Sequence, residues 1–216
     1  TLPSDEYLDL RRQLALGWIR RGELGRADSM LGADSSIDGL ALRGRLLLYR
    51  GDLDGAVEAF KAAGPYAGER AEATRRTMLL ALLQPIEADS LPALGDALWR
   101  LEQGDTAAAQ RGLEQVAGGL PPAKGGAELR LLAGRLAAAH GRRDLAERLY
   151  RAAATPDAPG TAPAAELALA ELLVGERRAA DAIGLLEHLI LTYPESALVP
   201  QARRLLDQAR GGVPQT

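Results

Sequence analysis

The side chains best suited to metal binding or acid–base chemistry in this chain are its two histidines, His140 and His188. A structural zinc site needs four histidine, cysteine or carboxylate ligands at short, characteristic spacings. The chain has no cysteine, and neither histidine has a second histidine close to it in the sequence. His140 precedes a glycine, where an imidazolium can interact with the negative end of a helix. We therefore expect both histidines to be structural, with no metal ion and no other cofactor.

No catalytic motif is complete in the sequence. The glycine pairs at 118–119 and 125–126 flank Lys124, but a phosphate-binding loop needs its lysine directly after the second glycine, followed by serine or threonine. No serine stands in a Gly-x-Ser-x-Gly elbow. Asp5 and Glu6 fall where a helix is expected to start, and carboxylates favour the helix dipole there. These observations predict that the protein is not an enzyme and has no small-molecule substrate.

The composition favours an all-α fold. Of the 216 residues, 47% are hydrophobic and only 4% are aromatic, with alanine and leucine supplying most of the apolar mass. Small side chains let helices approach closely, whereas the β-branched and aromatic residues that a sheet favours are scarce. The formal net charge is −3, from 26 basic and 29 acidic residues. This balance gives no electrostatic reason to bind nucleic acid or an anionic membrane.

Nearly all basic residues are arginine, and asparagine is absent. We interpret this as the codon bias of a GC-rich genome, which favours a bacterial source and gives the number of arginines no functional meaning. No stretch approaches the roughly 18 consecutive apolar residues that a membrane span needs. The sequence starts at Thr1 without a methionine. We therefore expect a processed protein or a fragment, from which any targeting segment would already be gone.

The strongest pattern is internal repetition. Five segments share an amphipathic helix, a glycine turn and a second helix, and the turn glycines are Gly22, Gly51, Gly104, Gly141 and Gly175. Glycine suits a helix end that adopts the left-handed conformation, because it has no Cβ. A small residue seven positions before each glycine and an alanine after it are expected where the two helices cross. In the last repeat the alanine, Ala182, comes two residues late, which predicts a longer turn.

The uneven spacing of these turns suggests further elements. The glycines are separated by 29, 53, 37 and 34 residues, and the 53-residue gap leaves room for an extra helix at about 67–84, ended by Pro85. Ser196 is expected to cap a closing helix at about 197–210. The proline-containing stretch 155–163 predicts a linker between the last two repeats. We thus expect one α-helical domain over residues 1–210, weakly subdivided near 155–163, and a tail at 211–216.

This layout resembles the tetratricopeptide repeat family over most of the chain. The last turn spacing, 34 residues, is the period of that family, while only Trp18 fills the aromatic position of the first helix. The resemblance implies an α-solenoid of about five helix–turn–helix repeats, with the extra helix inserted and a capping helix at the C-terminus.

The last repeat is similar to those of bacterial cell-envelope tetratricopeptide proteins, which include the outer-membrane assembly lipoprotein and the Tol–Pal coordinator. The similarity lies in the run Leu-Thr-Tyr-Pro-Glu-Ser at 191–196, followed by apolar residues at 198, 205 and 206. It implies the periplasm or cell envelope in preference to the cytoplasm. It also implies a protein partner through which the chain could associate with membrane complexes.

The family pattern implies a concave groove lined by the first helix of each repeat. The positions that would contact a partner there are Arg12, Arg20, Arg45, Tyr49, Leu94, Leu98, Arg135 and Leu169. The arginines could clamp a carboxylate through two hydrogen bonds, although they could equally be solvated or paired with neighbouring carboxylates. Core packing is the alternative explanation for the leucines. A two-carboxylate clamp of the chaperone-tail type is disfavoured, because it needs asparagine.

These patterns together favour a non-catalytic scaffold or adaptor that binds a peptide or protein subunit in the groove. The alternative is a structural subunit or regulatory solenoid domain of a larger protein or complex, in which an apolar leucine face is a permanent interface. A monomer in solution would favour the adaptor, and concentration-dependent association would favour the structural subunit. An enzyme is a distant third.

Overall fold

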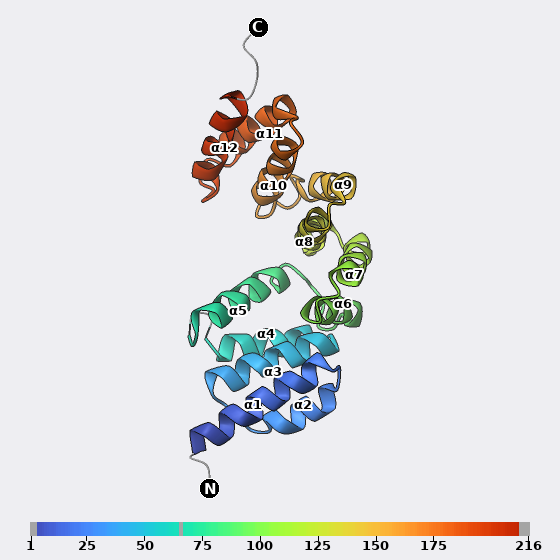
Figure 1. Ribbon diagram of the computed structural model, residues 1–216, viewed down its shortest axis with the longest axis vertical. Helices are drawn as coiled ribbons and strands as arrows, with labels where there is room; N and C mark the ends of the chain where they lie inside the picture. The colour runs from blue at the N-terminus through green and yellow to red at the C-terminus, as the bar shows by residue number, and fades with distance from the viewer. Residues whose placement is uncertain (1–3, 65–66, 212–216) are drawn as a thin grey trace. The chain divides into compact units, whose positions relative to one another are not determined.

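The computed structural model describes residues 4–64 and 67–211, and its regular elements in these ranges are all helical (Figure 1). Outside the helices, the described residues contribute a single isolated β-bridge, between Asp52 and Ser90. The prediction of an all-α fold is therefore confirmed. No helix in this part of the chain is both long and apolar enough to cross a membrane.

The helices follow one another with short connections. They are α1 (Ser4–Arg20), α2 (Leu24–Leu31), α3 (Ile37–Arg50), α4 (Leu53–Ala62), α5 (Arg70–Leu83), α6 (Pro92–Glu102), α7 (Thr106–Gly118), the short 3-10 helix η1 (Pro122–Lys124), α8 (Gly126–Ala139), α9 (Arg143–Ala153), α10 (Ala162–Gly175), α11 (Ala179–Thr192) and α12 (Val199–Gly211). Most neighbours along the chain pack against each other, most extensively α1 with α2, α3 with α4, α8 with α9, α10 with α11 and α11 with α12.

The chain forms two compact units, residues 1–112 and 113–216, which divide within α7. The predicted linker 155–163 lies inside the second unit, where it connects α9 to α10. Ala158, Thr161 and Pro163 in this stretch are buried. The predicted tail includes Gly211, which ends α12, and 212–216, which lie outside the described residues.

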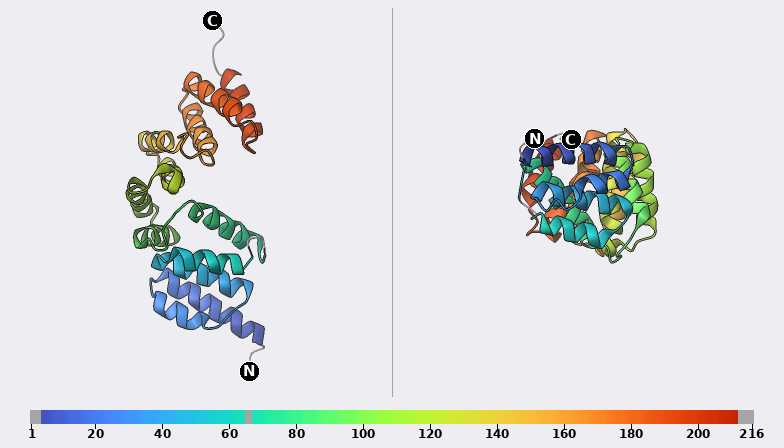
Figure 2. Two further views of the ribbon diagram at one scale, coloured as in Figure 1. Left: turned by 180° about the vertical axis from the view of Figure 1, so that it is seen from behind. Right: turned by 90° about the horizontal axis from the view of Figure 1, so that it is seen from below.

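The α3–α4 hairpin of the first unit shows how the sequence sets a turn. The hydroxyl of Ser36 caps α3 by accepting from the Gly39 amide at 3.0 Å, and the Asp52 carboxylate caps α4 in the same way. Between the helices Gly51 has a φ of +84°, the left-handed conformation predicted for the turn glycine. Helices α1 to α4 lie side by side in this unit (Figures 1 and 2).

In the α3–α4 and α8–α9 hairpins the two helices cross at a glycine, where a larger residue would have no room. A Cβ on Gly44 of α3 would come within 2.5 Å of the Phe60 ring of α4, and one on Gly134 of α8 would come within 2.6 Å of the Tyr150 ring of α9. Both rings are buried. The small residues predicted at these crossings are thus required by close approach of the helices.

The α10–α11 turn differs from the prediction. Gly175 is the last residue of α10, and the left-handed residue is Arg177, with a φ of +62°. Gly175 as the turn residue is therefore wrong. With Arg177 in that place, Ala182 stands five residues after the turn, as Ala27 and Ala56 do after Gly22 and Gly51 in the first two hairpins.

The predicted extra helix is confirmed as α5, and it is fixed to the first unit by Arg76. The guanidinium of Arg76 is 2% exposed and donates to the carbonyls of Gly64 and Ala67, ahead of the helix. After α5 the chain returns to the α3–α4 turn, where the Leu91 amide donates to the Gly51 carbonyl at 2.7 Å. Because of this return, α6 packs directly on α3.

Candidate functional site

Five charged or polar side chains meet on three helices of the first unit, and we call them the Glu102 cluster. They are Arg45 and Tyr49 of α3, Glu72 and Arg75 of α5, and Glu102 of α6. The Glu102 carboxylate lies 2.5 Å from Nη2 of Arg45 and 3.1 Å from Nη1 of Arg75. It also accepts a hydrogen bond of 3.2 Å from the Tyr49 hydroxyl. Glu72 approaches Arg45 to 3.9 Å from the other side.

The cluster is a structural link between the helices, because its central charge is buried. Arg45 is 4% exposed, and its Nε is a buried atom with no partner in the described part of the chain. Burial raises the pKa of Tyr49, so the phenol stays protonated and can donate to Glu102. The Arg45 guanidinium is buried and paired with Glu102 and Glu72 of its own chain. The expectation that Arg45 stands exposed in a groove is therefore wrong.

Arg12 is also held within the chain, at the junction of α1 and α3. Its Nε lies 2.9 Å from the Asp34 carboxylate, its Nη1 lies 2.6 Å from that of Asp9, and its Nη2 donates to the Ser36 hydroxyl at 2.8 Å. Ser36 is the N-cap of α3, so Arg12 fixes the start of that helix against α1. Of the two alternatives for this arginine, pairing with neighbouring carboxylates is the one observed.

The three predicted groove leucines belong to the core. Leu94 and Leu98 of α6 are 0% and 5% exposed, and Leu169 of α10 is 1% exposed. Helix α6 packs against α3, and α10 packs against α8, α9, α11 and α12, so these side chains fill the spaces between helices. The prediction that they line an accessible surface is wrong, and their alternative explanation, core packing, holds.

Two of the eight predicted groove residues remain exposed, Arg20 and Arg135. The side chain of Arg20 lies at the end of α1, where the backbone carbonyl of the same residue accepts from Gln103. Arg135 lies on α8, and its positive charge acts on Tyr150, whose pKa is nevertheless raised because burial dominates. Neither guanidinium forms an ion pair in the part of the chain that the structure describes.

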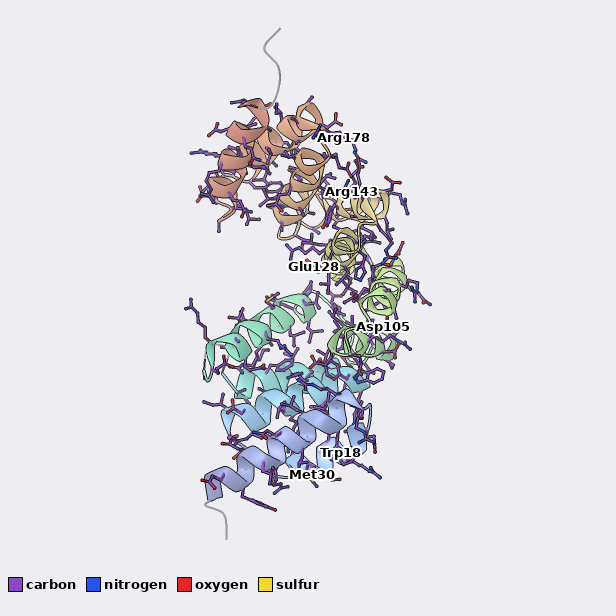
Figure 3. The ribbon with its side chains drawn as sticks, in the orientation of Figure 1. Trp18, Met30, Asp105, Glu128, Arg143 and Arg178 are labelled. Carbon is purple, nitrogen blue, oxygen red and sulfur yellow. The ribbon has the colours of Figure 1, made fainter. Side chains whose placement is uncertain are left out.

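Sequence reasoning missed a shallow, open cleft of about 380 Å³ at the start of α9. Three of its lining residues are arginines, Arg142, Arg143 and Arg148, and Asp144 is its acidic residue. Arg143 and Arg148 are exposed (Arg143 is labelled in Figure 3). Like Arg135, they form no ion pair among the described residues. Guanidinium groups bind carboxylates and phosphates in a planar, two-bond geometry. The exposed guanidinium groups of Arg143 and Arg148 could therefore bind an anionic group.

Each histidine has a hydrogen-bonding neighbour within the chain. His188 Nδ1 lies 3.0 Å from both carboxylate oxygens of Glu166, a residue 5% exposed, and the His188 ring meets the edge of Tyr193 at 6.2 Å between centroids. His140 Nδ1 lies 2.7 Å from the Leu136 carbonyl. No group of three or more histidine, cysteine, aspartate or glutamate residues within residues 4–64 and 67–211 is arranged to hold a metal ion. Glu166 is 22 residues from His188 in the sequence, which is why spacing gave no sign of this contact.

No family model matches the chain, and no curated protein sequence matches it significantly.

Proposed function

We propose that this chain is a non-catalytic scaffold or adaptor of the tetratricopeptide type, an α-solenoid that binds a peptide or a protein subunit. The observation that carries the proposal is the contrast between arginines that are paired within the chain and arginines that are not. Arg12 and the Glu102 cluster form ion pairs that join helices to one another, and the hairpins cross at small residues. The second unit presents arginines that no carboxylate of the described chain neutralises: Arg135 on α8, and Arg143 and Arg148 on α9.

The chemistry of these arginines favours an acidic partner. Half-buried Arg178, at the start of α11, is paired within the chain instead, with Glu147 at 2.9 Å and with Asp181 at 2.9 Å. A segment bearing carboxylates could supply the missing partners at α8 and α9. Each such contact would contribute modest affinity and strong orientation, because rim charges act mainly on association and register.

We further propose a bacterial cell envelope as the location, on the resemblance of residues 191–196 to the repeats of envelope tetratricopeptide proteins. The partner would then be a periplasmic segment or a subunit of an envelope complex. The second candidate, a structural subunit of a larger assembly, required an accessible leucine face as a permanent interface. Because Leu94, Leu98 and Leu169 are buried, that candidate now lacks its main support.

The test is capture of partners from envelope and soluble fractions of the source organism, using charge reversal on two separate surfaces. One variant carries Arg135→Glu, and a second carries Arg143→Glu and Arg148→Glu. The matched control reverses Arg203 and Arg204, two exposed arginines of α12. Arg45 is unsuitable, because reversing a buried charge would disturb folding.

We expect a partner that is retained by the parent and the control and lost by at least one of the two test variants. The variant that loses it identifies the binding face, and the fraction that supplies it identifies the compartment. A partner retained equally by all four proteins would contradict binding through these arginines. Failure to capture any partner with the parent would favour the structural-subunit candidate.

A further inference from the structure

Helix α1 carries a second apolar stripe that faces away from the core. Tyr7, Leu10 and Leu14 are 51%, 45% and 45% exposed, and their spacing of three and four residues puts them on one helical face. The core-facing side of the same helix is formed by Ala15 and Ile19, both 0% exposed. The next position along the stripe is Gly17, where an added Cβ would meet nothing within 4 Å. Apart from the Arg11 guanidinium, which lies over the Tyr7 ring at 5.7 Å from its centroid, the described residues leave this apolar stripe exposed, with an open notch at Gly17.

The internal repeat shows what normally covers these positions. Leu10 and Leu14 stand 12 and 8 residues before the turn residue Gly22. The same positions before Arg177 in α10 are Ala165 and Leu169, which are 0% and 1% exposed. Helix α10 packs there against the preceding hairpin, α8 and α9. The stripe on α1 is therefore the face that receives a neighbouring helix.

Helix α3 shows the same arrangement at the equivalent positions. Gly39 is buried, and a Cβ on it would come within 2.7 Å of the Asp34 carboxylate, in the loop that leads from the preceding hairpin. Arg43 donates to the carbonyl of Gly32, at the end of α2. Both positions again contact the hairpin that comes before, so the equivalent face of α1 is one that packs against another helix.

We propose that this stripe is a homodimer interface, in which α1 packs antiparallel against α1 of a second copy of this chain about a twofold axis. The sequence of the helix is complementary to itself in that arrangement. An antiparallel pair with the axis beside residue 12 brings Leu10 against Leu14 of the partner subunit and Tyr7 over the notch at Gly17 of the partner subunit. The large Tyr7 side chain thus packs over a glycine, and each leucine packs against a leucine.

The charges that flank the stripe support the same register. Glu6 and Arg20, both exposed, lie on one side of it together with Gln13. The antiparallel pair places Glu6 opposite Arg20 of the partner subunit on both sides of the axis, and Gln13 beside Gln13 of the partner subunit. Within one helix Glu6 and Arg20 are roughly 21 Å apart, so they can pair only between subunits. This gives Arg20 a role outside the groove.

A head-to-tail contact would not satisfy the stripe. The helix at the other end of the chain, α12, presents Arg203, Arg204 and Asp207 as exposed side chains. Such a surface would leave Leu10 and Leu14 opposite charges. Because one helix pair makes a small interface, we expect a reversible dimer whose population rises with protein concentration. This association through α1 is distinct from the permanent leucine-face interface of the structural-subunit alternative, so concentration dependence that Leu14→Glu abolishes does not favour that alternative.

The first test is sedimentation of the whole chain over a wide range of concentration. We expect the mass to move from one copy to two, and Leu14→Glu to keep the protein monomeric with an unchanged helical circular dichroism spectrum. The matched control is Leu191→Glu, because Leu191 is 80% exposed on α11 and lies outside the stripe. A parent that is monomeric at every concentration would assign the stripe to another protein and overturn the proposal. Equal association by Leu14→Glu and the parent would also overturn it.

The second test reads the register by cross-linking, which is direct because the chain has no cysteine. Gln13→Cys should oxidise to a disulfide-linked dimer, whereas Gln208→Cys on α12 should not. Tyr7→Cys would cross-link in a parallel pair, so a dimer formed by Tyr7→Cys instead of Gln13→Cys would refute the antiparallel arrangement. Arg20→Glu should weaken the dimer, and adding Glu6→Arg should restore it. Absence of that rescue would contradict the proposed charge pairing.

Discussion

The crossing of α8 and α9 at Gly134 gives the sharpest test of why small residues recur in this chain. A Cβ added there would come within 2.6 Å of the Tyr150 ring and 3.3 Å of the Leu149 Cβ. Tyr150 is 4% exposed, so the ring has no free space to move into. We expect Gly134→Ala to destabilise the protein, although alanine is the better helix former.

The magnitude follows from a comparison with Gly184 on α11. Gly184 is exposed, and an added Cβ there would meet nothing within 4 Å. Replacing an unhindered helical glycine with alanine gains about 1 kcal/mol, whereas overpacking a core costs about 1–3 kcal/mol. Because both substitutions gain the same helix propensity, the difference between the two variants isolates the steric cost. We expect Gly184→Ala to raise the free energy of unfolding by about 1 kcal/mol. The free energy of unfolding of Gly134→Ala should be about 1–3 kcal/mol lower than that of Gly184→Ala.

The assay is urea unfolding followed by circular dichroism, with the slope of the transition checked for each variant. Tyr150→Leu should remove most of the penalty of Gly134→Ala in a double-mutant cycle, because the two side chains are in direct contact. If Gly134→Ala stabilised the protein as much as Gly184→Ala does, the close crossing of α8 and α9 would be refuted.

Three further predictions concern the polar contacts of the first unit. Glu102→Ala leaves the buried Arg45 charge without its main partner and should cost about 3–5 kcal/mol in urea unfolding, and a loss below about 1 kcal/mol would mean that the cluster is solvated. For Asp34, burial alone would raise the pKa, but hydrogen bonds and the charge of Arg12 outweigh burial and lower it. Because its pKa is lower in the folded protein, the ionised Asp34 carboxylate stabilises the fold at pH values above its unfolded-state pKa of about 4. This stabilisation is lost as the pH falls through the folded-state pKa. Asp34→Asn should therefore destabilise the protein less at acidic pH than at neutral pH, and a constant difference across unfolding curves would contradict this. Trp99→Phe removes the indole N–H bond of 2.9 Å to the α1 backbone and should cost about 1 kcal/mol in the same assay, whereas an unchanged midpoint would mean that this bond contributes nothing.

Much of the fold could be predicted because its determinants are local. The turn glycines Gly51 and Gly141 predict helix ends in the left-handed conformation, and both residues have a positive φ. The extra helix α5 could be placed from the spacing between turns and from Pro85. The α10–α11 turn could not, because Arg177 adopts the left-handed conformation that sequence reasoning reserves for glycine.

The candidate site was less predictable, because its contacts join residues far apart in the chain. Arg45 and Glu102 are 57 residues apart, and nothing in either local sequence indicates that α5 and α6 return to α3. The burial of Leu94 follows from the same return. The cleft at Arg143 and Arg148 could not be predicted for a different reason. Arginine is abundant throughout the sequence, and the sequence alone does not show which arginines lack an ion pair.

Backbone hydrogen–deuterium exchange on the chain, free and bound to its captured partner, tests the central claim most directly. A scaffold that binds an acidic segment through Arg135, Arg143 and Arg148 predicts increased protection of amides in α8 and α9, with α12 unchanged. Protection confined to other helices, or no change in α8 and α9 on binding, would contradict the proposed function.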